Sequence, residues 1–133
     1  MKASLLCGLA VVLGLAAVPA IAHHSFAAEY DAAKPVKLTG TVTKVEWMNP
    51  HARFYLDVKD DAGKVTNWEF ELGSPNGLMR QGWTRNSMKV GDEVTVEGSM
   101  AKDGSKIANA RTVTLASGTR LFAASSQPGQ TPQ

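Results

Sequence analysis

Hydrophobic and polar residues alternate along much of the chain, in the pattern that predicts half-buried β-strands. From Val36 to Val42 an apolar or small residue occupies every second position. The alternation slips by one residue at Lys44, and Val45 and Trp47 then continue it. A one-residue slip inside a strand is typical of a β-bulge, which increases local bending. This segment therefore predicts a long, bent first strand.

Two more strands with the same period are predicted after Asn49 and Pro50, which end the first one. Their apolar faces are two sets of three alternating residues, Phe54, Leu56, Val58 and Trp68, Phe70, Leu72. Residues 60–64, Asp-Asp-Ala-Gly-Lys, supply a turn between them. Both sets share one face only if paired residue numbers add to an even total, which places Tyr55 opposite Glu69 or Glu71.

A short helix is predicted after the third strand. Ser74 supplies a capping hydroxyl, Pro75 suits the first helical position, and Gly82 is a suitable stop. Three apolar residues are expected to anchor this helix: Leu78, Met79 and Trp83. Two further strands are predicted over residues 93–98 and roughly 106–115.

The order of these elements predicts an all-β fold. It resembles the OB-fold, a five-stranded Greek-key barrel, here with a short helix between strands three and four. The barrel domain is expected to span residues 36–122, after an N-terminal arm of residues 23–35 that the sequence leaves open as a helical turn or an extended segment. Residues 123–133, rich in Ser, Gln and Pro, are too polar to form a core and predict a disordered tail.

Residues 1–22 have the features of a secretory signal peptide. Lys2 gives a positive start, residues 5–18 are mostly apolar, and Ala20-Ile21-Ala22 is a small-x-small cleavage site. At about 14 apolar residues the segment is too short for a permanent membrane anchor. We therefore expect a periplasmic or secreted protein that begins at His23. Val18-Pro19-Ala20 is a second acceptable cleavage site.

Composition narrows the function classes. The 133-residue chain without its first 22 residues suffices for one small domain. Its single cysteine, Cys7, lies in the signal segment, which excludes thiol catalysis in the processed protein. The 14 basic residues, 13 once Lys2 is removed, balance 12 acidic ones, so no broad attraction for nucleic acid is expected. No nucleophile beside a base is evident, and we expect no enzyme activity.

The three histidines give the most specific chemical hypothesis. His23 and His24 stand at the expected N-terminus, where an α-amine and imidazoles make a nitrogen-rich chelate, and His51 lies in the loop between the first two strands. Such ligands select Cu(II) or Ni(II), and imidazole also suits Zn(II). Cleavage after Ala20 would place His23 third, which also permits a square-planar copper chelate. The alternative is that all three are ordinary polar residues, with His51 bonded to local backbone.

A second hypothesis concerns the rim of the barrel, where a partner protein or an oligosaccharide would bind in the periplasm. The candidate residues are Trp47, Asn49, Tyr55 and Trp83. Packing is the alternative for the two tryptophans, and a charged outer strand surface is the alternative for Tyr55. A purely structural accessory domain is the third interpretation.

Three short motifs resemble those of a family of small exported bacterial proteins of unknown function. They are His23-His24-Ser25-Phe26, Gly40-Thr41-Val42 and Trp47-Met48-Asn49-Pro50-His51. The resemblance spans most of the processed chain and implies an OB-like barrel and export, but it supplies no activity. The sequence thus predicts an exported binding protein, with Cu(II) or another divalent metal as its candidate cofactor.

Overall fold

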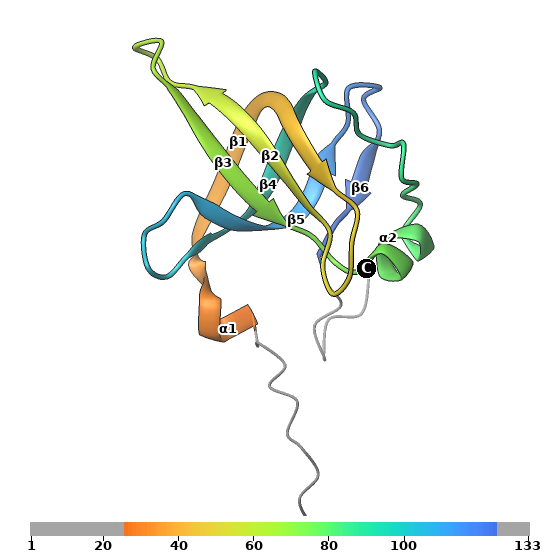
Figure 1. Ribbon diagram of the computed structural model, residues 1–133. Coiled ribbons are helices and arrows are strands. Elements are labelled where there is room, and N and C mark those ends of the chain that lie inside the picture. The colour runs from red at the N-terminus through yellow and green to blue at the C-terminus, as the bar shows by residue number, and fades with distance from the viewer. Residues whose placement is uncertain (1–25, 125–133) are drawn as a thin grey trace, which may run out of the picture.

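The computed structural model describes residues 26–124, which form one curled sheet with two short helices (Figure 1). The elements in chain order are α1 (Phe26–Glu29), β1 (Tyr30–Glu46), β2 (Arg53–Lys59), β3 (Val65–Glu71), α2 (Pro75–Arg80), β4 (Glu93–Ala101), β5 (Ile107–Thr114) and β6 (Arg120–Phe122). The predicted signal segment, His23, His24 and residues 125–133 lie outside the described residues. No helix among residues 26–124 is long and apolar enough to cross a membrane.

Five strands form a ring. They lie in the order β3-β2-β1-β4-β5 with antiparallel neighbours, and β3 closes the ring by pairing in parallel with β5. The helix α2 comes between β3 and β4 in the chain. The all-β class, the ring of five strands and the position of the helix are therefore as predicted. Closure pairs the edges that an open sheet would leave exposed.

The sequence does not predict β6, which lies beside β5 where β3 no longer pairs with it. Residues 107–109 of β5 pair with β3, and residues 112–114 pair with β6. The N–H of Ala123 then donates to the carbonyl of Arg111, and the carbonyl of Ala123 accepts from the N–H of Gly73. Ala123 is also fully buried. The sequence predicts Ala123 as the start of the tail, but it follows β6 directly, bonds to β5 and belongs to the core.

The longest strand, β1, carries the bend. It begins at Tyr30, so residues 30–35, assigned to the arm from sequence, extend the strand back toward α1. Its register with β2 shifts between Val42 and Lys44, which is the bulge that the slip in the pattern predicts. Since β1 pairs with β4 through one part of its length and with β2 through the other, it links the two halves of the ring.

The hairpin of β2 and β3 has the predicted register. Tyr55 lies opposite Glu69, and Arg53 lies opposite Glu71. The turn between the strands is fixed by the carboxylate of Asp60, which accepts two backbone N–H bonds. Because side chains alternate between faces, these charged and phenolic groups all lie on the face opposite the core.

The helix α2 is capped as expected. The hydroxyl of Ser74 accepts a hydrogen bond from the N–H of Gly77 at 3.2 Å. Gly82, just after the helix, has a positive φ of 96°. Leu78 is buried, whereas Met79 is half exposed. The prediction that Met79 anchors the helix is wrong, because a helix of six residues turns only one face to the core.

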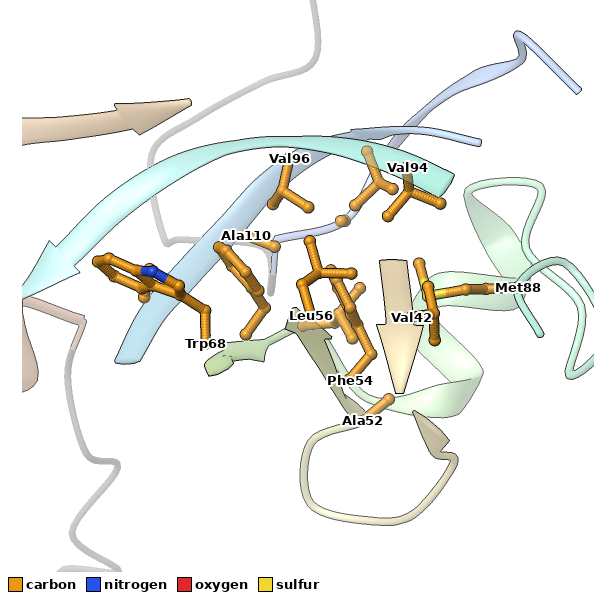
Figure 2. Close-up of a cluster of buried hydrophobic side chains, with 14 of the residues drawn as sticks. Val42, Ala52, Phe54, Leu56, Trp68, Met88, Val94, Val96 and Ala110 are labelled. Carbon is orange, nitrogen blue, oxygen red and sulfur yellow. The ribbon is translucent and has the colours of Figure 1, made fainter. Parts of the chain in front are cut away.

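The hydrophobic core lies inside the ring. Phe54 and Phe70 stack across β2 and β3 with ring centroids 5.2 Å apart. Figure 2 shows further core side chains converging from several strands, among them Val42, Leu56, Trp68, Val96 and Ala110. The period-two pattern therefore determines which residues are buried on each strand.

Candidate functional site

A polar cleft opens at the end of the ring where β1 begins and β3 ends. Its volume is about 360 Å³, and it is bounded by α1, the start of β1, Arg53, Glu71 and the turn between β4 and β5.

Glu71 forms the floor of this cleft. The residue exposes only 9% of its surface. Its Oε2 accepts a hydrogen bond from the hydroxyl of Tyr30 at 3.2 Å and another from Nη2 of Arg53 at 3.4 Å. Nη1 of Arg53 donates to Glu69. Arg53 thus bridges two carboxylates of β3, which offsets part of the cost of burying Glu71.

The Tyr30 hydroxyl is held in its neutral form. Burial raises the pKa of Tyr30 far above its ordinary value, and the charge of Glu71 and the hydrogen bond to it raise this pKa further. Glu29 acts in the same direction, whereas Arg53 opposes it. Tyr30 is therefore a hydrogen-bond donor at physiological pH and does not serve as a base.

The turn between β4 and β5 holds α1 beside the cleft. The backbone N–H of Lys102 donates to the carbonyl of Glu29 at 2.9 Å, and its Nζ donates to the carbonyl of Ala27. Asp103 accepts bonds from the hydroxyl and the N–H of Ser105, and these bonds lower the pKa of Asp103. The mouth of the cleft thus has a fixed carboxylate and a lysine that already binds the helix.

His51, the predicted metal ligand that lies within the described residues, is anchored by one ring nitrogen. Its Nδ1 lies 3.0 Å from the carbonyl oxygen of Leu72. A carbonyl oxygen only accepts hydrogen bonds, so Nδ1 is the donor, and in the neutral ring Nε2 is the nitrogen that carries the lone pair. Metal-bound histidines commonly have this arrangement, in which a backbone carbonyl orients the ring through its second nitrogen.

The helix α1 and the loop that contains His51 lie at the same end of the ring (Figure 1). The contacts agree, since Tyr30 bonds to Glu71 and His51 bonds to the neighbouring Leu72. Residues 26–124 contain no group of three His, Cys, Asp or Glu side chains arranged to hold a metal ion.

The sequence matches the model of a family of unknown function, DUF6152, over residues 11–110. The chain belongs to DUF6152. This agrees with the resemblance to a small family without an assigned activity. No curated protein matches the chain. The matched range includes the three histidines and the residues of the cleft floor, but membership of DUF6152 assigns no role to them.

The two tryptophans of the rim hypothesis lie together in this DUF6152 protein. Trp47 is half-buried against the core, and both it and Trp83 line an apolar crevice of about 10 Å³. That volume is close to the minimum that holds one water molecule. Trp83 is 4% exposed, and its indole N–H donates to the carbonyl of Phe122 at 2.8 Å. Trp83 therefore packs in the core and fastens β6.

The other two rim candidates lie elsewhere. Asn49 is exposed in the loop before His51. Tyr55 lies on the outer face of β2, where its hydroxyl donates to Glu46 at 3.2 Å and Nζ of Lys44 stands 5.2 Å from its ring centroid. The tryptophans face the core side and Tyr55 faces outward, so the four residues do not form one continuous surface.

The sequence pattern alone did not reveal the cleft of the DUF6152 chain. Pairing of residues whose numbers add to an even total allows Arg53 to lie opposite Glu71, so the sequence did contain a signal for this ion pair. The sequence predicts Tyr30 in the N-terminal arm, for which it does not favour a helical turn over an extended segment. The contact between Tyr30 and Glu71 spans 41 residues and depends on ring closure, which a local pattern does not report.

Proposed function

We propose that this chain is an exported binding protein that holds a divalent metal, Cu(II) in the first instance, through His51 and the histidines of its processed N-terminus, His23 and His24. The observation that carries the proposal is the hydrogen bond between Nδ1 of His51 and the Leu72 carbonyl. It orients the ring and leaves Nε2 as a metal ligand.

Chain geometry supports the convergence of the three histidines. His24 precedes Phe26, the first residue of α1, by two positions, and an extended chain covers roughly 3.3 Å per residue. The α-amine of His23, two imidazoles and Nε2 of His51 make up the nitrogen-rich donor set that favours Cu(II). Since α1 and the His51 loop share one end of the ring, the short connection suits such a set (Figure 1).

Copper titration of secreted protein tests the proposal, after mass spectrometry has defined the N-terminus. Electron paramagnetic resonance should show nitrogen coupling to Cu(II). The decisive variant is His51→Asn, because the amide keeps a donor for the Leu72 carbonyl but lacks the second nitrogen. Asn49→Ala, in the same loop, is the matched control.

We expect His51→Asn to weaken copper binding at least tenfold and to change the nitrogen coupling, and we expect Asn49→Ala to bind as the parent does. The proposal fails if secreted protein begins downstream of His24. It also fails if neither acetylation of the α-amine nor His51→Asn changes the copper affinity.

A further inference from the structure

We propose that the cleft above Glu71 binds a small organic cation, an alkylamine whose ammonium group pairs with the Glu71 carboxylate. This site is separate from the metal site proposed above and uses none of its ligands. At about 360 Å³ the cleft falls within the usual size range of small-molecule sites.

The first argument is the state of the Glu71 carboxylate. Its hydrogen bonds from Tyr30 and Arg53 both end on Oε2. Within residues 26–124, no buried side-chain oxygen or nitrogen that is sealed from solvent lacks a hydrogen-bond partner. Oε1 accepts no bond from those residues, so it must be accessible, and the cleft is the space that Glu71 lines. We infer that Oε1, on a residue that is nine-tenths buried, faces the cleft.

The second argument is the balance of charge. The lining includes three carboxylates, Glu29, Glu71 and Asp103, and two cations, Arg53 and Lys102. Both cations are engaged, Arg53 with Glu69 and Glu71 and Lys102 with a backbone carbonyl. Burial is the largest cause of the raised pKa of Tyr30, and among its charged neighbours Glu71 and Glu29 each raise this pKa by more than Arg53 lowers it, which is consistent with a negative field. A cation is favoured in such a field and an anion is repelled.

The third argument is the apolar part of the wall, which decides between an organic cation and a bare metal ion. Ala28, Ala101 and Ile107 line the cleft together with Tyr30. Hydrocarbon surface stabilises an alkyl chain by its burial and offers no ligand to a hydrated metal ion. The cleft therefore suits a chain of a few methylene groups that ends in an ammonium group.

Calorimetric titration with cadaverine tests this inference on the full processed protein, in the presence of EDTA so that metal plays no part. Pentanediol, of the same chain length and without charge, is the matched ligand control. We expect cadaverine to bind, more weakly as salt is added, and pentanediol not to bind. Lysine with its α-amine and carboxylate blocked as amides represents the other possible source of the ammonium group, a lysine side chain of a partner protein. It should bind more weakly than cadaverine, and tighter binding would overturn the assignment to a free amine.

Glu71→Gln should weaken cadaverine binding at least tenfold, and Glu93→Gln, an exposed carboxylate on β4 outside the cleft lining, should leave it unchanged. Circular dichroism establishes that Glu71→Gln is folded. Should it fail to fold, Glu29→Gln at the mouth of the cleft provides the test, with an expected loss of about threefold. Equal binding of cadaverine and pentanediol, no cadaverine binding by the parent protein, or unchanged affinity in a folded variant would each overturn the proposal. Copper binding and its loss in His51→Asn are independent of all these outcomes.

Discussion

The hydroxyl of Tyr30 donates a hydrogen bond of 3.2 Å to Oε2 of Glu71, across 41 residues of chain. Tyr30 is the first residue of β1, and Glu71 is the last residue of β3. These two strands are not neighbours in the ring. The bond therefore ties the entry of the chain to the far side of the ring and at the same time forms the floor of the cleft.

We expect Tyr30→Phe to lower the free energy of unfolding by about 1.5 to 3 kcal/mol, because a buried hydrogen bond to a charged group is lost. Urea denaturation followed by circular dichroism measures the change. Tyr55→Phe is the matched control, since its hydroxyl also donates to a carboxylate at 3.2 Å, but Tyr55 is only half-buried whereas Tyr30 is buried. Its cost should stay below about 1 kcal/mol. Equal losses in the two variants would show that the Tyr30 bond contributes no more than a surface contact.

Alkaline pH should destabilise the protein through the same residue. The pKa of Tyr30 is raised in the folded state by burial first and by Glu71 second. Above the ordinary tyrosine pKa of about 10 the unfolded chain loses this proton and the folded chain keeps it. The folded state then binds more protons, so the free energy of unfolding falls as pH rises.

Urea denaturation at a series of alkaline pH values measures this slope, and phenolate absorbance follows the ionisation directly. We expect the decline to be smaller in Tyr30→Phe than in the parent protein. Tyr55 provides an internal comparison, because its pKa is also raised, by burial and by Glu69 and Glu46. Identical slopes in the parent and in Tyr30→Phe would contradict the assignment of the alkaline sensitivity to Tyr30.

Periodicity predicts those parts of the fold that repeat every two residues. The bulge after Val42 and the pairing of Tyr55 with Glu69 both follow from keeping apolar side chains on one face. The cap at Ser74 follows equally from local chemistry. Each of these depends on residues close together in the chain or on one shared face.

The alternation of hydrophobic and polar residues does not predict the contacts that depend on closure of the ring. Tyr30 stands next to an Ala-rich segment with no clear period, and its hydrogen bond to Glu71 joins two strands that are not neighbours in the ring. Ala123 precedes a polar segment, and its hydrogen bonds to Gly73 and Arg111 come from segments far away in the sequence. The sequence predicts the loop that contains His51. Its bond to the carbonyl of Leu72 depends on how β2 and β3 pair after that loop.

Trp83→Phe should lower the free energy of unfolding by about 2 to 3 kcal/mol. The substitution leaves a cavity in the core and removes the donor to the Phe122 carbonyl. Trp47→Phe, at a half-buried position, is the control and should cost about 1 kcal/mol or less. Urea denaturation measures both. Faster hydrogen exchange of the Ala123 N–H in Trp83→Phe alone would locate the loss in β6. A smaller cost for Trp83→Phe than for Trp47→Phe would contradict the role assigned to the indole N–H.

Gly98 should be the least replaceable glycine of the ring. A Cβ placed on it would lie 1.9 Å from the carbonyl oxygen of Asn109 and 2.9 Å from the carbonyl carbon. These are backbone atoms of the neighbouring strand β5, at the point where its register with β4 shifts. Overpacking typically costs about 1 to 3 kcal/mol and occasionally more. Gly98 should lie at the upper end of that range, because the atoms in the way are backbone and relief requires the two strands to separate.

Gly98→Ala is therefore expected to abolish folding or to lower the free energy of unfolding by at least about 3 kcal/mol. Ser99→Ala is the matched control, since Ser99 is the next residue of β4 and pairs with Asn109 itself. It removes one oxygen atom and should change the stability by about 0.5 kcal/mol or less. Urea denaturation of the two variants gives the comparison. If Gly98→Ala folds with a loss near that of Ser99→Ala, the backbones of β4 and β5 can separate at little cost, and the close approach is not what requires glycine at this position.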